Sequence, residues 1–105
     1  MRSLLACCVA FALAGCLPRG GEVDALTDAQ VDAARTRSPD VTRAQLERGR
    51  RLALVHCGDC HAVPAPRDQR AEQWPETIAR MAGRAGLAEV QDREAVARFY
   101  VAAAP

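Results

Sequence analysis

The feature that most constrains this chain is a six-residue segment, 56–61, which contains two histidines and two cysteines. Its last five residues read Cys57-Gly58-Asp59-Cys60-His61, so two thiols lie two residues apart and an imidazole follows at once. A chain of 105 residues is long enough for one small domain. Because such a domain buries little apolar surface by itself, a large group bound here would form much of its core.

The spacing of these residues matches C-x-x-C-H, the attachment pattern of a c-type haem. Two thiols separated by two residues can each add to one vinyl group of the same porphyrin, and the next residue then lies under the iron. The sequence therefore predicts one haem c, bound covalently through Cys57 and Cys60 and ligated by His61.

Three other uses of the cysteine pair are weaker. A structural zinc ion needs four ligands, and the only further donor nearby is His56, which adjoins Cys57. A thioredoxin-like redox pair needs a strand followed by a helix, which this sequence does not indicate. A simple disulfide between Cys57 and Cys60 remains an alternative for a chain that never receives haem.

Residues 1–15 look like an export signal, with one early arginine and an apolar run too short to span a bilayer. The run ends in Leu13-Ala14-Gly15-Cys16, which resembles the bacterial lipoprotein signal box. This resemblance implies cleavage before Cys16 and a lipid on its thiol. We therefore expect an exported protein, anchored stably by its acyl chains on the periplasmic side of the inner or outer membrane of a bacterium. An ordinary signal with a chance cysteine is the alternative.

Beyond the signal, the sequence indicates an all-α chain, because no segment alternates with a period of two residues. We expect residues 16–41 to be a lipidated flexible tether with at most a short helix, and residues 42–105 to form the domain. The 14 basic residues nearly balance the 13 acidic ones, which argues against nucleic-acid binding.

The first helix of the domain is expected to begin at Thr42, where Gln45 completes a capping pattern, and to run into Cys57. Gly49 lies inside it at a cost of about 1 kcal/mol relative to alanine. A glycine at such a position indicates that another element packs closely against the backbone.

Two further helices follow a proline-containing loop over 62–73. The first begins at Trp74-Pro75, with Trp74, Ile78 and Met81 on one face. The second is expected near 92–104, and its apolar stripe consists of Val96, Phe99, Tyr100 and Ala103.

With these features, residues 42–104 resemble the small single-haem class I cytochrome c family. The resemblance implies three to four short helices wrapped around one covalently bound haem, with Trp74 and Ile78 packed against it. It also implies that Gly49 lets an aromatic residue of the last helix, Tyr100 or Phe99, approach the first helix.

The same resemblance implies that Met81 is the second axial ligand, opposite His61. The alternatives are that Met81 is only a core residue and that His56 is the distal ligand, although it directly precedes the attachment segment. Ligation by histidine and methionine raises the reduction potential of a haem relative to harder pairs of axial ligands. Four arginines are candidates for pairing with haem propionates: Arg48, Arg50, Arg51 and Arg67.

These expectations make the chain a one-electron carrier and not an enzyme, with redox proteins at the membrane surface as its partners. Two other functions stay open at this stage. One is a haem peroxidase or ligand sensor with a labile distal ligand. The other is a structural lipoprotein whose two body cysteines form a disulfide.

Overall fold

A computed structural model describes residues 23–58 and 60–105, which form four α-helices and two short 3₁₀ turns. No residue in these two ranges is in a β-strand, which confirms the all-α class. The export signal and the lipid site at Cys16 lie outside the described residues. The elements are α1 (Asp28–Arg37), α2 (Arg43–His56), η1 (Pro66–Asp68), η2 (Ala71–Gln73), α3 (Trp74–Met81) and α4 (Val90–Ala103).

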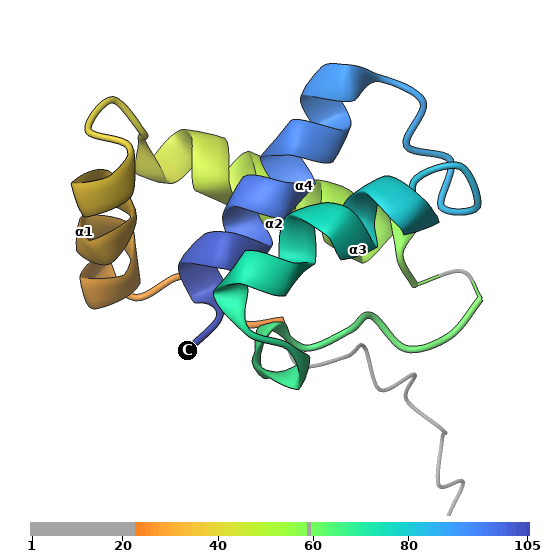
Figure 1. The fold of residues 1–105 in the computed structure, drawn as a ribbon, viewed down its shortest axis with the longest axis horizontal. Coiled ribbons are helices and arrows are strands. Elements are labelled where there is room, and N and C mark those ends of the chain that lie inside the picture. Colours follow the sequence, from red (N-terminus) through yellow and green to blue (C-terminus); the bar gives the residue numbers. More distant parts are fainter. Residues whose placement is uncertain (1–22, 59) are drawn as a thin grey trace, which may run out of the picture.

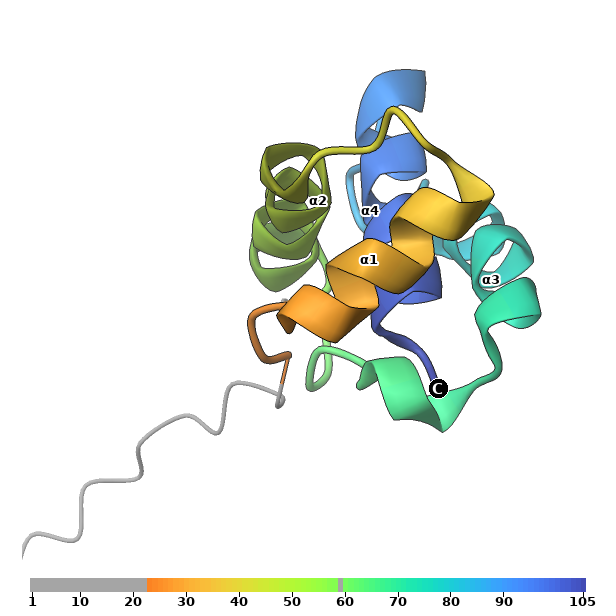
Figure 2. The same cartoon turned by 90° about the vertical axis from the view of Figure 1, so that its left-hand side faces the viewer.

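Helix α4 is the centre of the fold and contacts α1, α2, α3 and both 3₁₀ turns (Figure 1). Figure 2 looks onto α1, which crosses in front of α4 with α2 on one side and α3 on the other. The largest fully buried side chains are Trp74, Tyr100, Phe99, Leu46 and Val96. Three of them come from α4, so the core forms around this helix.

The contact between α2 and α4 depends on a missing side chain. A Cβ atom added to Gly49 would lie 2.0 Å from the carbonyl oxygen of Ala95 and 2.9 Å from the Cβ of Phe99. Only glycine lets the two backbones approach this closely. The expected glycine–aromatic crossing is therefore present, with Phe99 at the crossing, whereas Tyr100 lines a cavity elsewhere.

Local signals account for where the helices begin. Thr27 and Thr42 cap α1 and α2, and in each case the glutamine three residues later completes the capping box. Helix α3 begins at Trp74 with a proline in its first turn, as expected. Helix α4 starts at Val90, two residues before the expected start at 92.

The expected tether over 16–41 is wrong for the residues that the structure describes, because 23–41 belong to the domain. The core includes Val23, Leu26, Val31, Ala34 and Val41. The side chains that hold this segment come from α2, since Arg50 Nε donates to the Val23 carbonyl at 2.8 Å and Glu47 Oε1 accepts from the Leu26 amide at 3.1 Å. The domain boundary therefore lies at or before Val23.

Within the described ranges, no helix has both the length and the apolar character needed to cross a membrane.

Candidate functional site

A cavity of about 500 Å³ lies beside the C-x-x-C-H segment and gathers residues from five parts of the chain. The end of α2 supplies His56 and Cys57, and α4 supplies Tyr100. The other lining residues are Cys60, His61, Pro64 and Gln69 from the loop, Trp74, Thr77, Ile78 and Met81 from α3, and Arg84 and Ala85 from the turn that follows it.

The residues predicted to bind the haem meet in this cavity. The two cysteines and His61 are close in sequence, but Met81 lies 20 residues beyond His61 and still lines the same space (81 − 61 = 20). Trp74 and Ile78 also line the cavity, as expected from their shared face with Met81. Gly49 and Phe99 lie at the α2–α4 crossing and do not belong to the cavity lining.

One face of helix α3 lines the cavity because Trp74, Ile78 and Met81 recur at helical intervals. Trp74 and Ile78 are buried, and Met81, the last residue of the helix, is half-buried on the same side. A half-buried thioether that lines a cavity can contact a ligand placed there, which a fully enclosed core methionine cannot. This position leaves Met81 available as a soft sulfur ligand.

His61 is exposed on the loop and its ring orientation is fixed by its neighbour. Its Nδ1 atom lies 2.7 Å from the carbonyl oxygen of Ala62. A carbonyl oxygen only accepts hydrogen bonds, so Nδ1 is the donor and Nε2 takes no part in this bond. Metal-bound histidines usually use this arrangement, in which the second ring nitrogen donates to a carbonyl or carboxylate.

Cys57 and Cys60 are free thiols, half-buried and exposed respectively. Burial raises the pKa of the Cys57 thiol above its ordinary value of 9.0. Redox-active C-x-x-C pairs instead have a depressed thiol pKa, which makes the thiolate nucleophilic. The described residues also contain no β-strand, so they lack the strand–helix setting of a thioredoxin-like pair.

A zinc site gains no support from the residues that the structure describes. Over 23–58 and 60–105, no group of three or more histidine, cysteine, aspartate or glutamate side chains is placed to hold a metal ion.

Two stacked aromatic rings form one wall of the cavity and also hold the loop. The rings of Trp74 and Tyr100 are 4.1 Å apart between centroids and inclined by 24°. Trp74 Nε1 donates to the Pro66 carbonyl at 3.0 Å, and the Tyr100 hydroxyl donates to the Pro64 carbonyl at 2.9 Å. Each ring thus gives an apolar face to the core and a polar tip to the loop.

The same burial changes the acidity of Tyr100. Desolvation, with smaller contributions from Cys57 and Asp68, raises the pKa of its phenol well above the ordinary value of 10.0. The hydroxyl therefore remains protonated at neutral pH and keeps donating to Pro64.

Arg84 is a site residue that the sequence analysis missed. None of the four arginines proposed for haem propionates lines the cavity, and Arg48 instead forms an ion pair with Asp92. Arg84 is the one arginine among the described lining residues. It follows Met81 by three positions, so extending the helical spacing of α3 by one turn would have found it.

His56 is the last residue of α2, and its half-buried ring lines the cavity. Its Nδ1 atom lies 3.1 Å from the carbonyl oxygen of Ala85.

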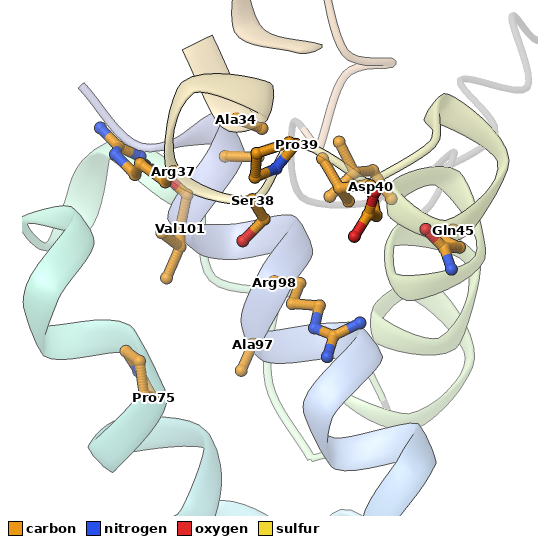
Figure 3. A pocket seen from close by; sticks show the side chains of 13 residues that line it. Ala34, Arg37, Ser38, Pro39, Asp40, Gln45, Pro75, Ala97, Arg98 and Val101 are labelled. Atoms are coloured by element: carbon orange, nitrogen blue, oxygen red, sulfur yellow. Dashed lines mark hydrogen bonds between the residues drawn. The ribbon is translucent and has the colours of Figure 1, made fainter. Parts of the chain in front are cut away.

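A second cavity, of about 470 Å³, lies between the end of α1, the turn over 38–41, α2 and α4. Figure 3 shows Ser38 and Asp40 on one side of it and Arg98 on the other. None of the predicted haem-binding residues lines this cavity, so it is not part of the site described above.

The chain matched no protein-family model, no curated protein and no solved structure. The candidate site therefore depends on its own geometry and on the resemblance of its motifs to those of class I cytochromes c.

Proposed function

We propose that this protein is a membrane-anchored electron carrier with a cytochrome c-like fold and one covalently bound haem c. The observation that carries the proposal is the cavity in which Cys57 and Cys60, His61 and Met81 come together. In this proposal the cysteines form the two thioether bonds, and His61 and Met81 are the axial ligands.

The residues around the cavity fit a haem in their chemistry. Its volume of about 500 Å³ is within the range of cofactor pockets. Trp74, Ile78 and Tyr100 offer apolar contacts to a porphyrin face. Arg84 offers a cation to its carboxylates, for which a guanidinium is well suited.

The haem iron, when bound, supplies the chemistry by taking up and releasing a single electron between its ferric and ferrous states. The protein residues determine whether other chemistry occurs. His61 would hold the iron through Nε2, because its Nδ1 donates to the Ala62 carbonyl. With Met81 as the second ligand, no coordination position is left for a substrate, which favours electron transfer over catalysis.

The anchoring part of the proposal rests on Cys16, with partners that are redox proteins at one periplasmic membrane surface. Val23, the first described residue of the domain, follows Cys16 by seven positions. A fully extended chain spans at most about 3.6 Å per residue, so a lipid on Cys16 would hold the domain within about 25 Å of the bilayer. Partners must therefore be reached at the membrane surface.

A second function, a haem peroxidase or ligand sensor, is favoured by the position of Met81. This residue is only half-buried and ends its helix, so a small molecule could displace its sulfur from the iron. This function would use the same cysteines and His61 but would not need a permanent distal ligand.

Visible spectra of the full chain, produced with a haem-attachment system, test the proposal. An electron carrier should show a low-spin c-type spectrum and, when oxidised, the weak long-wavelength sulfur-to-iron band. A high-spin ferric spectrum, together with carbon monoxide binding to the ferrous protein, would favour the ligand sensor. A purified protein without haem would contradict both functions. It would favour the structural lipoprotein with a disulfide between Cys57 and Cys60.

A further inference from the structure

The chain beyond Met81 forms a closed turn that ends α3. The amide of Ala85 donates to the Met81 carbonyl at 3.0 Å, and the amide of Leu87 donates to the Ala82 carbonyl at 3.0 Å. Gly86 has a φ of 71°, the left-handed conformation that favours glycine. The bond from Leu87 to Ala82, the left-handed Gly86 and the burial of both Ala82 and Leu87 are features shared with the Schellman motif.

A helix end of this kind leaves carbonyl groups without intrahelical partners. His56 satisfies one of them, because its Nδ1 atom lies 3.1 Å from the Ala85 carbonyl oxygen. The carbonyl can only accept, so Nδ1 is the donor whether the ring is neutral or charged. The ring also lies against Gly86, where an added Cβ would be 3.7 Å from Nδ1.

This hydrogen bond connects the two sides of the proposed haem site. His56 is the last residue of α2 and directly precedes Cys57, the first attachment residue. Ala85 accepts from His56 through its carbonyl and donates to Met81 through its amide. Ala85 therefore connects His56, beside the attachment segment, to the backbone of Met81 through two hydrogen bonds.

We infer that His56 is a positioning residue that holds the α3 end against α2, so that the Met81 sulfur stays within reach of the haem iron. This inference rests on the proposed function. It gives His56 a role that is neither axial ligation nor solvent exposure. Because Met81 is the last residue of α3, the turn over 82–87 is the segment that holds its backbone on the C-terminal side.

The test compares three variants of the full, haem-loaded chain. His56→Leu removes the donor, whereas His56→Asn keeps a donor at nearly the same position as Nδ1. Val55→Ala is the matched control, because this neighbouring side chain is 66% exposed. The readouts are the sulfur-to-iron band of the ferric protein, its loss on heating compared with the loss of helical circular dichroism, and carbon monoxide binding to the ferrous protein.

We expect His56→Leu to lose the sulfur-to-iron band at a lower temperature than its helical signal and to bind carbon monoxide several-fold faster than the wild type. His56→Asn should recover most of the wild-type behaviour, and Val55→Ala should match it. An unchanged band in His56→Leu, or a band lost only together with the helices, would overturn the positioning role alone. A wild-type ferric spectrum without this band would overturn both the Met81 assignment and the role of His56.

Discussion

The α2–α4 crossing and the loop over 57–69 are held in different ways. At the crossing, Gly49 lies directly against the Ala95 carbonyl and Phe99, and the surrounding side chains are fully buried. The loop has an exposed Cys60 and an exposed His61, and a few hydrogen bonds from Trp74 and Tyr100 hold it. The crossing thus depends on close packing between two helices, whereas the loop depends on a small number of side-chain hydrogen bonds.

The largest expected effect is at the crossing. Gly49→Ala should destabilise the domain by about 3 kcal/mol or more, because its Cβ would overlap the Ala95 carbonyl and force the helices apart. Gly83→Ala is the matched control, since no atom lies within 4 Å of the added Cβ and the residue does not have a positive φ. Urea unfolding of the haem-loaded variants measures both. Equal stabilities for the two variants would show that the crossing is not close-packed.

At the site, Met81→Ala should remove the sulfur-to-iron band and lower the reduction potential, while the melting temperature falls by about 5–15 °C. The side chain is half-buried, so truncation costs about 1–2 kcal/mol, less than a fully buried methionine would cost. Met81→Leu keeps the volume and separates loss of sulfur from loss of packing. If Met81→Leu kept the band, Met81 would not be the distal ligand.

Tyr100 joins the two regions, because it lies on α4 and its hydroxyl donates to the Pro64 carbonyl of the loop. Tyr100→Phe removes the hydrogen bond to Pro64 and should cost about 1 kcal/mol at neutral pH. A folded-state pKa above 10.0 means that the native state retains its proton longer than the unfolded state. The Tyr100 phenol therefore contributes its full stabilisation to the wild type below pH 10.0, and this stabilisation is lost as the pH rises toward the raised pKa of the folded state.

The free energy of unfolding, measured at several pH values around and above 10.0, gives the slope of stability against pH. The wild type should lose stability with rising pH more steeply than Tyr100→Phe, which has no phenol to titrate. Parallel slopes for the two proteins would show that this phenol is not the group responsible.

The smallest structural effect is expected at Arg84. Arg84→Gln should change the stability by less than about 0.5 kcal/mol, because the side chain is exposed. It should nevertheless lower the reduction potential, since removing a nearby positive charge favours the ferric iron. Arg80→Gln is the control, because Arg80 pairs with Glu76 and does not line the cavity. Identical potentials for the two variants would remove Arg84 from the site.

The sequence predicted the parts of this molecule that depend on local chemistry. The capping boxes at Thr27 and Thr42, the start of α3 at Trp74 and the glycine at the crossing could all be found from spacing and residue type. The gathering of Trp74, Ile78 and Met81 on one wall followed from the helical period.

The errors concern contacts between distant residues. The segment 23–26 was taken for a tether because its composition is that of a linker, but Glu47 and Arg50 hold its backbone across more than 20 residues of chain. Arg84 was missed because the helical spacing was not extended beyond Met81 into the turn that follows α3. The contact between His56 and Ala85 joins residues 29 positions apart, and no local pattern shows such a contact.

The central place of α4 also has a consequence for how such a chain is made. Helix α4 contacts all the other elements and supplies Val96, Phe99 and Tyr100 to the core, yet it is formed by residues 90–103. Until residues 90–103 have been made, α2 and α3 lack the helix that both of them contact. Up to that point the chain would stay open, with its cysteines accessible to modification.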